Sequence, residues 1–204
     1  MTPVKRAPAD PLADRLVDAA ARILSTEGAA ALTLRRLAQT VGVSTMPVYT
    51  LFGDKQGLLA AMYRAGYQRL GAALTAAAEA ADDPLQALVN LGHAYRTTAL
   101  ANPDLYDLMF GRPVPAFRPD NETKDVAETT FRPLVAAVQR CLDAGRLTGA
   151  DAERISLHLW AVSHGMVSLE LAGHLAEDPD QAYEEALVLS SAAFLVLVHA
   201  NEAP

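Results

Sequence analysis

The chain has 204 residues and a net charge of −7 at pH 7, with 51% hydrophobic but only 6% aromatic residues. This length and apolar content suffice for a sizeable core, mostly of Ala and Leu. Strand-like alternation and recurring repeats are absent, and the apolar residues recur every three or four positions. We therefore predict an all-α fold.

The N-terminal residues 1–10 carry two cations with no apolar run behind them, so we expect a flexible arm rather than a signal peptide. Uncharged runs such as residues 155–169 are shorter than the roughly 18 apolar residues that a membrane span needs. We therefore expect no membrane association and a cytoplasmic location. Cys141, the single cysteine, cannot form an internal disulfide and is expected to fill core space.

The net charge hides an asymmetry between two parts of the chain. Residues 1–70 hold nine Lys and Arg against five Asp and Glu, a balance of +4, whereas the remainder holds eight against nineteen, a balance of −11. A basic first third beside an acidic remainder is typical of a small polyanion-binding module joined to another domain. Chance distribution of charges is the alternative.

Capping residues and helix breakers divide the first part of the chain into short helices. Thr33, Ser44 and Asp54 can each cap a helix, and Gly28 and Gly42 can end one. The helices expected here cover residues 11–27, 34–41, 45–52 and a long segment after residue 54. Those expected beyond it lie near residues 84–101, 103–110, 122–145, 151–173 and 180–199.

The second and third helices have the spacing of a helix-turn-helix. Ala38 is small enough for two helix backbones to approach each other, and Gly42 permits the tight turn between them. The apolar residues expected in the small core of this unit are Leu37, Val41, Val43, Val48 and Leu51. The second helix of such a unit enters the major groove of DNA by its N-terminal end. A tight helical corner without a DNA role is the alternative.

This geometry assigns roles to the polar residues around the turn. Thr45, Met46 and Pro47 would lead the helix toward base edges, and Pro47 is tolerated because first-turn N–H groups lack intrahelical partners. Other side chains can reach phosphates. The full set of predicted DNA-binding residues is Thr33, Arg35, Arg36, Ser44, Thr45, Met46, Pro47, Tyr49, Thr50 and Lys55.

The run TLRRLAQTVGVSTMPVYTLFGDK, residues 33–55, resembles the DNA-binding domain of the TetR family of transcriptional regulators. The matching positions are Leu37, Ala38, Gly42, Val43, Ser44, Tyr49, Phe52 and Lys55. The family commonly has His where this chain has Leu51, so we expect Leu51 to pack rather than to contact a phosphate.

A second, weaker resemblance involves Trp160, His164 and Gly165, which are similar to a TetR-family C-terminal domain type named for Trp, His and Gly. Together the resemblances imply a homodimeric repressor that a small effector releases from a palindromic operator. They imply a three-helix DNA-binding domain, residues 11–57, joined by a long helix to a regulatory and dimerisation domain within residues 58–204.

The last two predicted helices carry apolar residues on two opposite faces, which suggests that one face packs within the chain and the other against a second chain. Small residues near position 190 would let helices approach closely. The predicted dimer contacts are Leu187, Ser190, Phe194 and Leu197. A monomer that buries both helices is the alternative.

An apolar effector would need a cavity, and aromatic and Met residues could line one. The candidates are Tyr106, Met109, Phe110, Phe117, Phe131, Trp160 and His164. Each of them could instead be plain core, and His164 is expected to be a satisfied core or interface residue. A regulator that responds to no ligand, or to a protein partner, is the alternative function.

An enzyme is a much weaker interpretation. The five His include no pair at one-turn spacing with a carboxylate partner, and the chain has neither a nucleophile elbow nor a Gly-rich phosphate loop. We therefore expect no catalytic residues, no metal and no cofactor.

Overall fold

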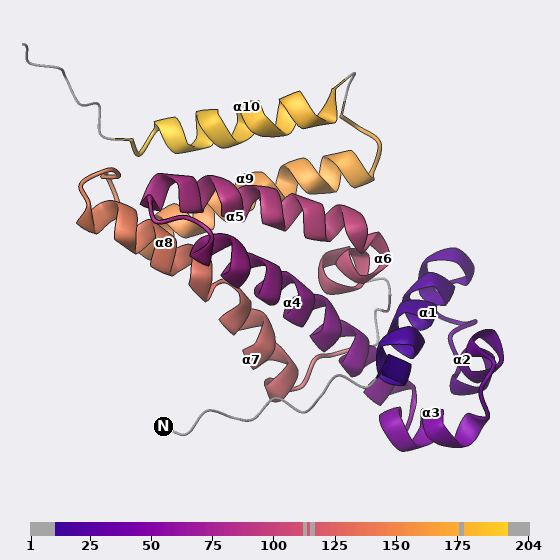
Figure 1. Cartoon of the computed structure of the whole chain (residues 1–204). Helices are drawn as coiled ribbons and strands as arrows, with labels where there is room; N and C mark the ends of the chain where they lie inside the picture. The colour runs from indigo at the N-terminus through magenta and orange to yellow at the C-terminus, as the bar shows by residue number, and fades with distance from the viewer. Residues whose placement is uncertain (1–10, 112–113, 115–116, 176–177, 196–204) are drawn as a thin grey trace, which may run out of the picture. The chain divides into compact units, whose positions relative to one another are not determined.

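The computed structural model describes residues 11–111, 114, 117–175 and 178–195, and these residues form helices and no strands. The prediction of an all-α fold is therefore confirmed (Figure 1). The chain divides into two compact units, of which one holds residues up to Tyr67 with Asp104–Val126 and the other holds Gln68–Pro103 with the residues from Ala127 on. The predicted arm lies outside the described residues, and the domain boundary after residue 57 stays a prediction.

The first unit begins with the predicted helix-turn-helix. Its helices are α1 (Pro11–Glu27), α2 (Leu34–Val41), α3 (Thr45–Phe52) and the first part of the long α4 (Lys55–Glu79). The Thr33 hydroxyl accepts a 3.1 Å hydrogen bond from the backbone N–H of Arg36, and Asp54 caps α4 through the N–H of Gly57 at 2.9 Å. Ser44 occupies the N-cap position of α3, but its side chain makes no capping hydrogen bond.

The turn between α2 and α3 depends on Gly42, whose φ of 74° lies in the left-handed region. The N–H of Val43 donates to the carbonyl of Ala38 at 3.0 Å, so the chain folds back tightly at the end of α2. Val48 and Phe52 bury one face of α3 in the core of the unit. Leu51 is 38% exposed, so the expectation that it packs was wrong, because Val48 and Phe52 define a narrow inward face that Leu51 does not share.

Gly57 lies where the C-terminal end of α3 approaches the first turn of α4. A Cβ atom at this position would lie 2.0 Å from the carbonyl oxygen of Phe52, much closer than any real contact. Only glycine therefore allows the first turn of α4 to approach the last turn of α3 so closely.

The remaining helices depart from the predicted ranges in three places. The observed elements are α5 (Pro84–Ala101), α6 (Pro103–Tyr106), the π-helix η1 (Asp107–Gly111), α7 (Asn121–Thr130), α8 (Arg132–Asp143), α9 (Ala152–Leu171) and α10 (Pro179–Ala192). The helix expected over 122–145 is two helices, because Pro133 has no N–H to continue the ladder and starts α8 instead. The helix expected over 103–110 turns into a π-helix, and the last helix ends at Ala192 rather than at 199.

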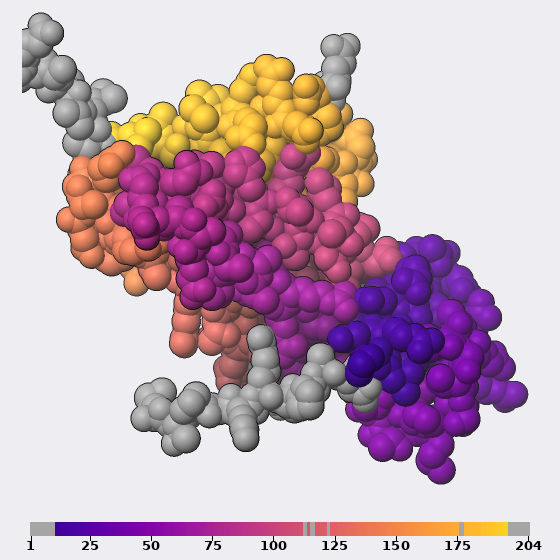
Figure 2. All heavy atoms as spheres, in the orientation of Figure 1, coloured from indigo at the N-terminus to yellow at the C-terminus, as the bar shows by residue number. Residues whose placement is uncertain are grey.

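The second unit packs α5, α8, α9 and α10 together. Val138 and Cys141 of α8 and Ile155 of α9 are fully buried in its core. Burial raises the pKa of the Cys141 thiol to about 11, so this group is an uncharged core residue at neutral pH. Figure 2 shows α10, in yellow, lying directly against α5, in magenta. None of the described helices is long and apolar enough to cross a membrane.

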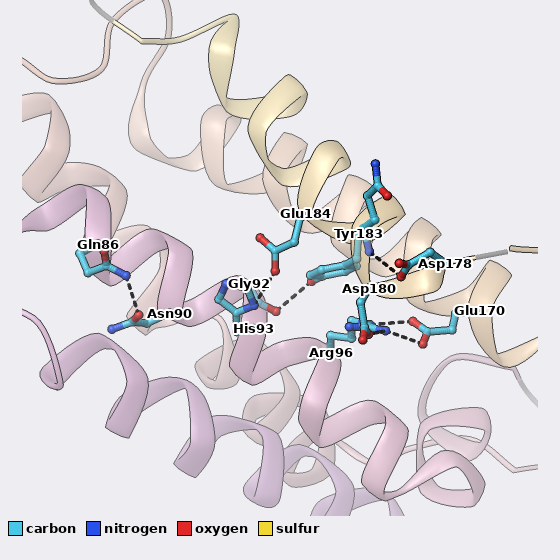
Figure 3. Close-up of polar contacts among 11 residues, drawn as sticks. Gln86, Asn90, Gly92, His93, Arg96, Glu170, Asp178, Asp180, Tyr183 and Glu184 are labelled. Atoms are coloured by element: carbon cyan, nitrogen blue, oxygen red, sulfur yellow. Dashed lines mark hydrogen bonds and ion pairs between the residues drawn. The ribbon is translucent and has the colours of Figure 1, made fainter. Parts of the chain in front are cut away.

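Arg96 of α5 joins three helices of this unit (Figure 3). Its guanidinium donates two 2.7 Å hydrogen bonds to the carboxylate of Glu170 on α9 and one of 2.6 Å to Asp180 on α10. The side chains of Arg96 and Glu170 are only 16% and 14% exposed. The bonds to Glu170 raise the pKa of the guanidinium above its usual range, so the pair stays ionised.

Replacing Arg96 should therefore destabilise the second unit. Arg96→Met leaves the Glu170 carboxylate buried without its cation, and we expect a loss of about 3–5 kcal/mol in the free energy of unfolding. Asp180→Asn is the matched control, because the Asp180 side chain is 85% exposed and an exposed pair contributes only about 0–1 kcal/mol. Urea denaturation followed by circular dichroism would measure both. Equal losses for the two variants would contradict this account.

Candidate nucleic-acid interface and ligand cavity

The outward face of α3 carries large side chains that the fold does not bury. Met46 is 73% exposed and Tyr49 is 51% exposed, although both belong to residue types that usually pack. Thr45 and Thr50 are exposed on the same short helix, while Pro47 is partly buried in its first turn. This face offers a thioether, methyl groups and hydroxyls, which can contact base edges and phosphates in a groove.

The cationic residues near this face differ in whether they already have a partner within the protein. Arg35 of α2 is exposed, whereas Arg36 forms a 3.1 Å ion pair with Glu27 in which both side chains are about half exposed. The ammonium group of Lys55 donates a hydrogen bond to the carbonyl oxygen of Ala29. Lys55 therefore ties the start of α4 to the turn after α1, and its predicted phosphate contact stays a prediction.

The predicted ligand residues separate into two groups. Tyr106, Met109, Phe110 and Phe117 belong to the first unit, where Tyr106 and Phe110 pack with ring centroids 4.8 Å apart. Met109 sits over Gly66, where a Cβ atom would lie 2.5 Å from its sulfur. These contacts are those of tightly packed core.

Phe131 and Trp160 belong to the second unit, and they line a cavity of about 130 Å³ between its helices. Their ring centroids are 4.6 Å apart. The other lining residues come from α4, α5, α8, α9 and α10, and they are Leu74, Leu88, Val89, Leu91, Gly92, Tyr95, Leu134, Leu159, Ser163, Glu184, Leu187, Val188 and Ser191. A cavity of this size and lining can hold a small apolar molecule.

His164 does not line this cavity but contacts two of the residues that do. Its Nδ1 atom is 3.1 Å from the hydroxyl of Tyr95, and its ring centroid is 5.9 Å from that of Trp160. Burial lowers the pKa of His164, so the imidazole is neutral at pH 7 and can accept a hydrogen bond from Tyr95. His164 thus positions a lining residue from behind.

Sequence reasoning missed the contribution of α10 to the cavity. Leu187 was predicted to contact a second chain, but it packs on Gly92 of α5, where a Cβ atom would lie 2.9 Å from its methyl carbon. A glycine in the middle of α5 was the one available sign of such a close approach. The ion pairs of Arg96 could not be predicted from the sequence, because Arg96 and its partners are far apart along the chain.

Two of the other predicted dimer contacts also pack within their own chain, and their place in a dimer stays a prediction. Ser190 is buried and Phe194 packs against the ring of His158, with centroids 5.3 Å apart. Leu197 lies outside the described residues. Leu189 of α10 is 74% exposed and does not line the cavity, whereas Val188 lines it and is still 65% exposed.

The described residues contain no group of three His, Cys, Asp or Glu side chains that lie close enough together to hold a metal ion.

Comparison with known proteins agrees with this arrangement. Residues 16–62 match the family model described as bacterial regulatory proteins, tetR family, and residues 88–189 match the tetracyclin repressor-like C-terminal domain. An HTH-type transcriptional regulator of Mycobacterium tuberculosis is 27% identical, with 80% of this chain and 82% of the relative covered.

Solved structures give the same answer. A protein of unknown function from Rhodococcus sp. RHA1 superposes with a TM-score of 0.79 and 28% identity, covering 95% of this chain and all of that one. A proposed regulatory protein superposes with a TM-score of 0.73 and 30% identity, covering 88% of this chain and 94% of that one. The chain therefore belongs to the TetR family, and it is a DNA-binding transcriptional regulator.

Proposed function

We propose that the protein is a repressor that reads a palindromic operator with α3 and leaves it when a small apolar molecule binds the second unit. The observation that carries the DNA-reading role is the pair of exposed residues Met46 and Tyr49 on a helix whose other face is anchored by Val48 and Phe52. Large exposed side chains on a rigidly held helix are suited to contact with a partner.

In this proposal Thr45, Met46 and Pro47 meet base edges, because the N-terminal end of the second helix enters the major groove. Tyr49 and Thr50 bind phosphates, and Arg35 adds a cation beside them. Arg36 and Lys55 contribute less direct contact, since each already has a partner within the protein. Thr33 and Ser44 act through the helix starts that they occupy.

We place the dimer interface on the outward face of α9 and α10. The exposed apolar residues there are Leu157, Leu169, Leu171 and Leu189. Such a concentration on neighbouring helices is typical of a protein–protein contact. A two-fold dimer would present two α3 helices to half-sites about one helical turn, roughly 34–36 Å, apart.

The base-reading role is tested by Thr45→Ala. Loss of its hydroxyl and methyl should change which base is preferred at one position of each half-site, by on the order of 1 kcal/mol. Thr26→Ala is the matched control, because Thr26 is also an exposed threonine of the first unit but lies at the end of α1. Selection of bound sequences from random DNA would compare the variants. The proposal fails if both select the same site as the wild type.

The phosphate-binding role is tested by Tyr49→Phe. Removing one hydroxyl that donates to a charged oxygen should weaken binding to every sequence by about 1–2 kcal/mol and leave base preference unchanged. Because the side chain is half exposed, the melting temperature should not move. Gel-shift titration on operator and random DNA measures this. Unchanged affinity for both would remove Tyr49 from the interface.

The dimer proposal is tested by two single substitutions to Glu on α10, at positions two residues apart that lie on different faces of the helix. Leu189→Glu places a carboxylate on the exposed face and should give a folded monomer with weak operator binding. Leu187→Glu places it against Gly92 and should mainly lower the melting temperature. Analytical ultracentrifugation and thermal melting distinguish the two. A Leu189→Glu variant that stays dimeric would contradict the assigned face.

A further inference from the structure

The chemistry of the cavity in the second unit limits what it can bind. Most of its wall is hydrocarbon from Leu and Val side chains, with the rings of Phe131, Trp160 and Tyr95 at one side. Such a wall favours an apolar body, and aromatic faces also attract a cation. The charged and hydrogen-bonding groups of the lining therefore decide which polar head the ligand can carry.

Glu184 of α10 is the one charged residue among the residues that line the cavity. Its carboxylate is about half exposed and lies 3.2 Å from Nδ1 of His93 (Figure 3). Arg96, one turn further along α5, is held by Glu170 and Asp180 through bonds of 2.6–2.7 Å. An anionic head in the cavity would thus meet a carboxylate and no available guanidinium.

Two of the three hydroxyl groups in the lining already have partners within the protein, so they offer an anion little compensation. Ser191 donates to the carbonyl of Val188 at 3.0 Å, and the Tyr95 hydroxyl is engaged with His164 at 3.1 Å. Moving an anion out of water into a site with few donors and a carboxylate carries a large desolvation penalty. The same lining accepts a cation, because Glu184 supplies the opposite charge.

We infer that the effector is a small organic cation with an apolar body, such as an alkylammonium. Its charged head lies at Glu184, and its body lies along Phe131 and Trp160. This inference rests on the proposed ligand-responsive function and names the ligand class of that site. Glu184 exchanges its contact with His93 for one with the ligand head. The apolar body fills the space between α5, α8 and α9.

The test uses three probes with one alkyl chain: octyltrimethylammonium, octanol and octanoate, each below its aggregation concentration. Trp160 is the single tryptophan of the chain and lines the cavity, so its fluorescence reports binding directly. At pH 7 the full-length protein should bind the ammonium at least about tenfold more tightly than octanoate, with octanol in between. Octanoate binding as tightly as the ammonium would overturn the inference.

Two variants locate the charge. Glu184→Gln should weaken ammonium binding about fivefold or more and leave octanol binding unchanged. Glu185→Gln is the matched control, because Glu185 is the next residue of α10, is exposed, and accepts a 2.7 Å hydrogen bond from Gln181 rather than lining the cavity. Equal effects of the two substitutions on ammonium binding would refute the role of Glu184.

Gel-shift titration on the selected operator, with and without the ammonium, separates this inference from the proposed function. Tight ammonium binding without any change in operator affinity keeps the ligand class and refutes release by the ligand. Normal operator binding with no fluorescence response to any probe overturns the ligand class and leaves the DNA-reading role intact.

Discussion

The orientation of α3 depends on the burial of Val48 and Phe52 in the core of the first unit. An isolated helix of eight residues is not stable in water, so the core behind it must supply both its stability and its rotation. Gly42 supplies the left-handed turn before α3, and Gly57 allows α4 to approach the last turn of α3 closely. Met46 and Tyr49 are exposed because the opposite face is fixed in this way, and the proposed reading surface follows from that packing.

In the second unit, contacts at both ends of α10 fix its position. Its first turn is joined to α5 and α9 through Arg96, and the residues after its last turn pair with the α8–α9 connection, where Thr148 donates to the carbonyl of Phe194 at 2.8 Å. Between these points one face lines the cavity, with Val188 at its exposed edge, and Leu189 is exposed away from it. The proposed ligand and the proposed second chain would therefore act on one helix, which gives them a physical route for reciprocal coupling.

Local signals predicted the first unit well, because caps, glycines and apolar spacing all act within a few residues. Thr33, Gly42 and Asp54 have the predicted roles, and Leu51 failed because a step of one residue from Phe52 turns the side chain by about 100° around the helix, away from the buried face. Contacts distant in sequence could not be predicted. Aromatic composition placed Phe110 and Phe131 in one site, whereas the chain places them in different units, and the glycine within α5 indicated a close approach without showing that Leu187 makes it.

The central claim is that α3, held by its buried face, reads a specific DNA sequence. Selection of sites from random duplex DNA by the full-length protein, at physiological salt, tests it most directly. The account predicts enrichment of one palindromic sequence whose two halves lie about one helical turn apart. A bound pool that shows no enriched sequence over the starting DNA would contradict it.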